Sequence, residues 1–193
     1  PPASPTKRHA DPTCAGLASR PASTATPITL DDLRTHLRID GSDLDSMLGL
    51  LAGAVTAEAE ARCRRAWMAQ GWVQVEPAPC ARIDLARWPV LSVLGVRDGR
   101  GDLVAGTDYI IRVGDAGSVE VVGGWCGEVT IEYRAGYAEP DPGASDPDAD
   151  AARCREAVPA AVRWWLLDRC RERHDGSAVA DGALLDPYVV YRT

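Results

Sequence analysis

Apolar residues follow a helical spacing in three segments of the chain, and each segment predicts a helix. The first covers residues 29–38, where leucines recur every three or four positions. Thr29 and Asp32 at its start have the pattern of a capping box. The second covers residues 43–69, where one apolar stripe continues for about six turns. The third covers residues 159–174. Together they predict a small bundle of two N-terminal helices and one C-terminal helix.

Between these helices the apolar period changes from helical to twofold. Short runs rich in valine and isoleucine are separated by turn sequences such as RDGRGD and GGWCG. In the run EVTIEY, apolar and polar side chains alternate, as one buried and one solvated sheet face requires. Residues 72–134 are therefore predicted to form an antiparallel β-sheet subdomain inserted between the helices, which makes the fold class α+β.

Three segments lie outside this pattern. Residues 1–27 contain six prolines and almost no large apolar side chain, which predicts a flexible or partner-ordered arm. Residues 138–150 are acidic and contain prolines, which predicts a linker or an exposed loop. Residues 177–193 are apolar and aromatic but too few to fold alone, so this tail must pack on the domain or on a partner. The remaining residues 28–176 are predicted to form one domain.

The charge of the chain is concentrated in one place. The net charge of the 193 residues is −7. A general nucleic-acid binder needs a basic surface, so the negative net charge argues against that class. It does not exclude a protein whose surface lines a path for DNA, since such a surface should repel DNA weakly. The chain has no apolar run long enough to span a membrane and no signal-peptide pattern at its start, which predicts a soluble intracellular protein. Five of the negative charges belong to Glu139, Asp141, Asp146, Asp148 and Asp150.

The stretch IDGSDLD, residues 39–45, gathers three carboxylates around a glycine. A calcium loop that started at Asp40 would need oxygen ligands at its fifth and twelfth positions, where the chain has leucines. A helix start fits better, with Ser42 as N-cap and Asp45 at the third helical position. We therefore predict a tight turn at Gly41 that leads into the long helix.

Residues with catalytic or metal-binding chemistry are sparse. The six cysteines have no CxxC spacing and are interpreted as free thiols. Cys170 and His174 are one helical turn apart, but a zinc site needs four ligands and no second pair is spaced to join them. The chain has no GxSxG, no HExxH and no phosphate-binding glycine loop. The sequence therefore predicts no catalytic residue, no metal site and no cofactor.

Two tryptophans are candidates for a subunit interface. Neighbouring positions on a helix are about 100° apart, so Trp164 and Trp165 cannot both face one narrow core stripe. Trp165 aligns with the apolar stripe of its helix, which leaves Trp164 either at the edge of the core or as an interface anchor. Trp67, at the end of the stripe of the second helix, is the other interface candidate.

Five segments carry a resemblance through their order and spacing. They are ITLDDLRTHLRIDGSDLDSMLGLLAGAVTAEAEARCRRAW, RIDLARWPVLSVLGVRD, DYIIRV, EVTIEYRAGY and VPAAVRWWLLDRCRERHDG. In this order they resemble the head-to-tail connector, or adaptor, proteins of long-tailed bacteriophages and gene transfer agents. The resemblance covers about residues 28–193, and it explains neither the N-terminal arm nor the acidic segment.

The resemblance implies a structural virion protein and no enzyme. Such adaptors form a ring, typically dodecameric, that docks beneath the portal at the head-tail joint. The ring presents a platform for the stopper or tail proteins, and DNA passes through its lumen without sequence-specific binding. The helices resemble those that build the ring, the sheet insertion resembles its outward or tailward lobe, and the C-terminal tail reaches the portal. The residues that this likeness assigns to portal contact are Leu184, Leu185, Tyr188, Val189, Val190 and Tyr191.

The main alternative is a small DNA-binding regulator that uses its first two helices as a helix-turn-helix. A recognition helix should begin with side chains that donate hydrogen bonds to bases and phosphates. The second helix begins instead with Asp43 and Asp45. The acidic start therefore favours a scaffold over a DNA reader.

Overall fold

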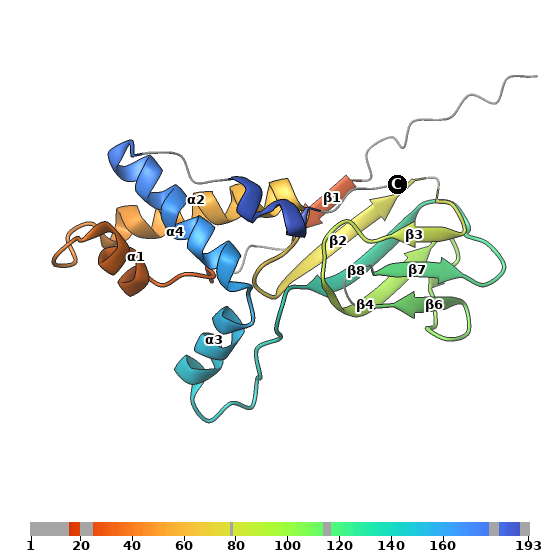
Figure 1. Ribbon diagram of the computed structural model, residues 1–193. Coiled ribbons are helices and arrows are strands. Elements are labelled where there is room, and N and C mark those ends of the chain that lie inside the picture. The colour runs from red at the N-terminus through yellow and green to blue at the C-terminus, as the bar shows by residue number, and fades with distance from the viewer. Residues whose placement is uncertain (1–15, 20–24, 78, 114–116, 178–181, 190–193) are drawn as a thin grey trace, which may run out of the picture.

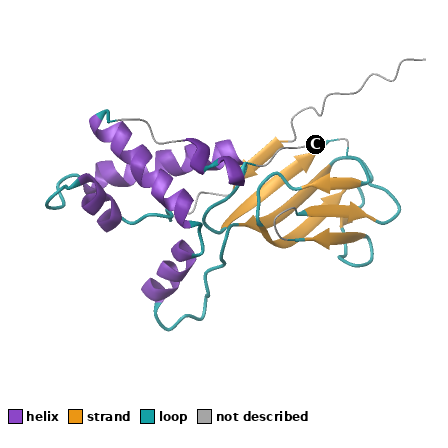
Figure 2. Ribbon diagram, in the orientation of Figure 1, coloured by secondary structure: helices purple, strands orange, loops and turns teal. Residues whose placement is uncertain are grey.

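A helical lobe and a β lobe lie end to end in the computed structural model (Figures 1 and 2). The described residues are 16–19, 25–77, 79–113, 117–177 and 182–189, with no side-chain description for 16–19. The helices are α1 (Leu30–Leu37), α2 (Asp45–Cys63), α3 (Pro147–Glu156) and α4 (Ala160–Asp175), followed by the short 3-10 turns η1 (Gly182–Leu184) and η2 (Asp186–Tyr188). The strands are β1 (Gly16–Ser19), β2 (Gln70–Glu76), β3 (Arg82–Asp84), β4 (Val90–Asp98), β5 (Gly101–Asp102), β6 (Tyr109–Arg112), β7 (Ser118–Val121) and β8 (Val129–Ala135). The α+β prediction is confirmed.

The first helix begins at the predicted capping box. The Asp32 backbone N–H donates to the Thr29 hydroxyl at 3.0 Å, and the Thr29 N–H donates to the Asp32 carboxylate at 2.8 Å. Two of the N–H groups that a helix start leaves unpaired are satisfied in this way. The helix ends where Arg38 takes a left-handed conformation with φ of 56°.

The long helix is shorter than predicted, and its start differs from the prediction. Leu44 is the N-cap of α2 and provides no side-chain cap bond, so the assignment of Ser42 as N-cap is wrong. Asp45 instead forms an ion pair with Arg34 of α1. This charged partner on another helix was invisible to a local capping rule. At the other end α2 stops at Cys63 because Arg64 adopts φ of 54°, which closes the helix six residues before residue 69.

Two antiparallel sheets build the β lobe, where the sequence predicted one antiparallel sheet subdomain inserted between the helices. The larger sheet has the order β1-β2-β8-β4-β5, and the smaller has the order β3-β7-β6. Along β8 the residues Val129, Ile131 and Tyr133 are buried, while their neighbours are more exposed, as the alternation in EVTIEY predicted. These side chains share one core with Ile83 and Val119 of the smaller sheet.

A buried glutamine on β2 bonds to the segment that contains β3. Gln74 is fully buried, and its side-chain oxygen accepts a hydrogen bond from the Ala86 N–H at 2.8 Å. Its amide nitrogen donates to the Asp84 carbonyl at 3.1 Å. A buried amide is stable only when its polar atoms are paired. These bonds therefore fix the smaller sheet against β2.

The helical lobe has its own core between α1, α2 and α4. Leu33, Leu48, Val55, Leu166 and Cys170 are buried in this core. On α4 the predicted division of the tryptophan pair is confirmed, because one ring is buried and the other is largely exposed. The helical lobe and the β lobe therefore each have a hydrophobic core of their own.

Two predictions about the flanking segments need correction. Within the predicted arm, residues 16–19 form strand β1, which pairs antiparallel with β2. Within the predicted acidic loop, residues 147–150 are the first turn of α3, and the Asp146 side chain caps that helix. An Asp-Pro pair, with Asp as N-cap and Pro at the first helical position, was the sequence signal for this helix. Figure 1 shows α3 standing away from the main bundle at the end of its loop.

Candidate functional site

The C-terminal tail packs on its own domain up to Val189. Leu185 is fully buried in the helical core, with Leu184, Tyr188 and Val189 packed partly against it. Of the two partners that the sequence allowed for this tail, the described part uses the domain itself. In this position Leu185 presents no surface to a partner, and the assignment of the tail to portal contact stays a prediction. Val190 and Tyr191 lie outside the described residues.

Polar contacts from the end of α2 hold the tail backbone. Arg65 Nε donates to the Tyr188 carbonyl at 2.9 Å. Arg62 donates to the Gly182 carbonyl at 3.1 Å and to the Asp186 carboxylate at 3.0 Å. Charged donors on carbonyls that would otherwise lose water are among the stronger hydrogen bonds in proteins. The tail is therefore attached by both packing and polar bonds.

Trp67 lies at the centre of this attachment and not at a surface. Its ring is fully buried, stacked with Tyr137 at 5.8 Å between centroids and edge-on to Tyr188 at 6.1 Å. Trp67 forms no exposed surface of the single chain, and its role at a subunit interface stays a prediction. The apolar stripe did identify it as buried, but only the fold showed that the ring supports the tail.

Trp164 has the opposite environment. Its side chain is 55% exposed. The His36 ring lies edge-on to it at 5.4 Å, and His36 in turn lies 3.2 Å from the Asp168 carboxylate. An exposed aromatic ring held by neighbours costs little entropy to fix on binding. The interface prediction for Trp164 stays a prediction with a favourable geometry.

A second exposed apolar surface runs along α2, and the sequence reasoning did not single it out. Leu50 is 78% exposed and Met47 is 43% exposed. Ala54, Ala57 and Ala61 continue the same face and are exposed as well. The available signal was that LGLLAGAV carries no charge on any side of the helix, whereas a helix that covers one core should be polar on its outer face.

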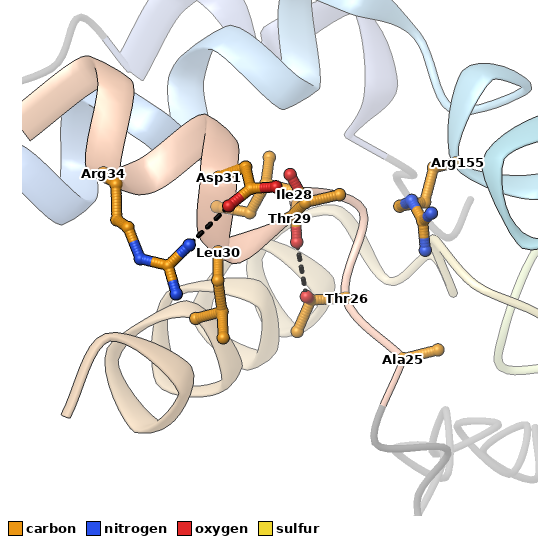
Figure 3. A pocket seen from close by; sticks show the side chains of 8 residues that line it. All are labelled: Ala25, Thr26, Ile28, Thr29, Leu30, Asp31, Arg34 and Arg155. Atoms are coloured by element: carbon orange, nitrogen blue, oxygen red, sulfur yellow. Dashed lines mark hydrogen bonds and ion pairs between the residues drawn. The ribbon is translucent and has the colours of Figure 1, made fainter. Parts of the chain in front are cut away.

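A hollow of about 460 Å³ opens between the start of α1 and the end of α3. Figure 3 shows Arg155 reaching it from α3, while Arg34 turns toward Asp31 on the α1 side. The Thr26 hydroxyl donates to the Ile28 carbonyl at 2.7 Å and closes one wall. The lining holds no nucleophile with a neighbouring base, so it offers a surface for contact and no catalytic chemistry. Its lining residues are Ala25, Thr26, Ile28, Thr29, Leu30, Asp31, Arg34 and Arg155.

The titratable groups with shifted pKa values serve the fold. Burial raises the pKa of Cys63 to about 11 and that of Cys170 to about 12, which keeps both thiols protonated and unreactive at neutral pH. Burial also raises the pKa of Glu60. The Glu60 carboxylate accepts hydrogen bonds from the backbone N–H of Trp67 and from the side-chain amide of Gln70, at 3.0 Å each. Among the described residues no cluster of three or more His, Cys, Asp or Glu could hold a metal ion.

A buried carboxylate organises the turn that contains RGD. Asp98 accepts hydrogen bonds from the Arg100 backbone at 2.8 Å, the Arg100 guanidinium at 2.7 Å and the Cys126 N–H at 3.0 Å. The hydrogen bond from the Arg100 guanidinium is the main reason that the pKa of Asp98 falls to about 2. The RGD sequence is therefore turn chemistry, as predicted, and its aspartate faces Arg97 at 2.7 Å.

The comparisons with known proteins give a fold and no sequence family. No protein-family model matches the chain, and no curated protein matches it. A chain in the neck of an empty gene transfer agent particle, computed with C6 symmetry, aligns with TM-score 0.69 and 20% identity over 92% of this chain and 97% of that one. The chain has the fold of a gene transfer agent neck protein.

Two further structures of gene transfer agent particles agree with the first. A chain in the virion of a native gene transfer agent particle aligns with TM-score 0.70 and 21% identity, over 92% of this chain and 96% of that one. A chain in the neck of a native particle, computed with C12 symmetry, aligns with TM-score 0.67 and 23% identity, over 92% and 97%. Each alignment spans nearly the whole of both chains, so it includes the helical lobe and the β lobe together. No helix among the described residues is both long and apolar enough to cross a membrane.

Proposed function

We propose that this chain is a structural neck protein of a phage or phage-like particle. In this role it forms a ring, most simply a dodecamer, between the portal and the stopper or tail, joins head to tail and surrounds the path of DNA. The observation that supports the role is the alignment over 92% of this chain and at least 96% of the neck chains, at TM-scores of 0.67 to 0.70. A match over both lobes supports the assembled role more strongly than a match to one lobe would.

The surfaces of the chain suit a scaffold better than the alternative, a helix-turn-helix regulator. The first turns of α1 and α2 carry Asp31, Asp32 and Asp45. A helix-turn-helix protein places the N-terminal end of its recognition helix in the DNA groove, where these carboxylates would be repelled by the phosphates. The outward face of α2 is also apolar, which does not suit contact with DNA. A salt-dependent duplex-binding measurement separates the two roles: affinity that falls steeply with salt would favour the regulator.

The tail contacts the portal through its end in this proposal. Leu185 anchors the tail, and Leu184, Tyr188, Val189, Val190 and Tyr191 remain the candidates for portal contact. Removal of residues 183–193 would take Leu185 and Tyr188 out of the helical core, so that variant would test stability and binding together. Removal of residues 190–193 leaves every described contact in place and is the cleaner change.

We predict that the 190–193 deletion keeps the thermal midpoint within about 2 °C of the full chain, since it removes no described contact. It should lower the amount of this chain in purified portal-containing particles at least tenfold. Quantitative mass spectrometry against the capsid protein measures that amount. Full incorporation of the truncated chain would contradict the portal role of the tail.

The ring itself is tested by electron microscopy of particles that carry a tagged chain. The expected result is density for the tag in a symmetric ring at the head-tail joint. A tag found elsewhere in the particle, or absent from particles while the tagged chain is folded in the cell, would contradict the proposed function.

A further inference from the structure

The outward face of α2 is apolar along its whole length. Met47, Leu50, Ala54, Ala57 and Ala61 are separated alternately by three and four residues, so they form one continuous stripe. All five are exposed, Leu50 to 78%. At 1.5 Å per residue the stripe is about 21 Å long. A face of this kind on a protein surface marks an interaction site.

Two glycines beside this stripe are not required by the packing of the chain itself. Gly49 and Gly53 lie inside α2, where glycine destabilises a helix relative to alanine. A Cβ atom built on either of them meets nothing within 4 Å. Gly49, Gly53, Ala57 and Ala61 are four residues apart, so a row of small residues, which we call the groove, runs next to Leu50. The groove allows a partner to approach the helix closely.

A second exposed apolar side chain, Trp164, lies on another side of the helical lobe. The buried side of α2 faces the helical core through Leu48, Val55 and Ala59. The exposed stripe lies on the opposite side of the helix and therefore faces away from α4. Trp164 projects from α4 on the side of α1, where His36 contacts its ring. The two surfaces therefore belong to different sides of one lobe. A ring of identical chains needs such a pair, because each copy must offer one face to each neighbour.

The charges next to the two surfaces have opposite signs. Asp40 and Asp43 are exposed just before α2, and within the described part of the chain neither has an ion pair. Arg163 precedes Trp164, is half-buried, and forms no ion pair within the described part of the chain. Arginine beside an aromatic anchor is the composition favoured at the centre of protein interfaces.

We propose that a second copy of this chain covers the α2 face, with its Trp164 seated in the groove beside Leu50 and its Arg163 directed to Asp40 and Asp43. The inference rests on the proposed function, since it names the two faces through which the ring closes. It adds the residues of the contact and its polarity, which runs from the α4 side of one copy to the α2 side of the next.

Substitution Gly53→Leu separates assembly from folding, because it should raise the stability of the chain and lower its incorporation into particles. Leucine favours the helix, and a Cβ at this position meets no atom of its own chain within 4 Å, so the thermal midpoint of the purified protein should rise by about 2–4 °C. The same side chain fills the groove, so incorporation into particles should fall at least tenfold. The matched control is Ala149→Leu on exposed α3, which should change neither quantity. Normal incorporation of Gly53→Leu would overturn the inference.

A cross-linking experiment locates the contact directly. The chain for this experiment has Cys14, Cys80 and Cys126 replaced by serine and carries the two substitutions Ala54→Cys and Trp164→Cys. Particles that contain this chain are treated with a short bis-maleimide, which links two cysteine thiols. Each copy then links to the next, so a denaturing gel should show a ladder of multimers. Either cysteine alone, or Trp164→Cys with Ala149→Cys, should give no ladder.

The outcomes distinguish this inference from the proposed function. Rings that are visible by electron microscopy but give no ladder would overturn the α2 contact and leave the neck role standing. A cross-link from residue 54 to a different protein would also overturn it. Charge reversal Arg163→Glu should reduce incorporation, and addition of Asp43→Arg should restore it. Absence of the wild-type chain from the head-tail joint would instead contradict the neck role itself.

Discussion

Leu185 offers the sharpest test of how the tail is attached. Its side chain is fully buried among residues of the helical core, although it lies outside α1, α2 and α4 and only eight residues before the end of the chain. Substitution Leu185→Ala should therefore behave as a large-to-small change in a core and not as a change in a loose terminus.

The size of the effect follows from the burial. Removing three buried carbon atoms at about 0.8 kcal/mol each costs about 2.4 kcal/mol of transfer free energy. A residual cavity of about 50 Å³ would add about 1.2 kcal/mol, and partial collapse of the tail would reduce that term. We expect the free energy of unfolding to fall by about 3 kcal/mol. For a chain of this length that loss corresponds to a thermal midpoint lower by roughly 6–12 °C.

Urea denaturation of the purified protein, followed by tryptophan fluorescence, measures this change. Asp186→Ala is the control in the same segment, because it removes an ion pair with Arg62 whose side chains are 61% and 43% exposed. An exposed pair of this kind contributes at most about 1 kcal/mol. A Leu185→Ala effect no larger than that of the control would refute the docked tail.

Two further predictions concern pH. Asp98 has its pKa lowered to about 2, so it contributes stability above the usual carboxyl pKa of about 4, and that contribution is lost as pH falls toward 2. Acid titration of Asp98→Asn should lack this component, and an identical acid profile would contradict the assignment. Glu60 has a raised pKa, so its ionisation costs stability as pH rises from about 4 through the raised value. Glu60→Gln keeps an oxygen for the Trp67 backbone N–H, so its thermal midpoint should gain on that of the wild type as pH rises above about 4, the ordinary carboxyl pKa. A difference in midpoint that does not change with pH would contradict this reasoning.

Local sequence patterns predicted the elements that depend on local rules. The capping box at Thr29, the alternation along β8 and the division between Trp164 and Trp165 were all readable because each depends on residues a few positions apart. Contacts between distant residues were not readable in this way. Asp45 is paired with a residue of another helix, so Ser42 does not cap α2. Tyr188 packs on Trp67 from more than a hundred positions away in the chain.

The order of helix and strand patterns by itself determined the α+β class and the sheet insertion, because periodicity is a property of the chain alone. The resemblance to head-tail adaptors came separately, from five sequence segments in their order and spacing. The tertiary structure decided which apolar side chains are buried inside the molecule and which are exposed on its surface. Leu185 and Leu50 are both leucines in apolar stretches, yet one is fully buried and the other is 78% exposed. That difference depends on what packs against each side chain, and it is what separates the core of this protein from the surface on which we expect its neighbour to bind.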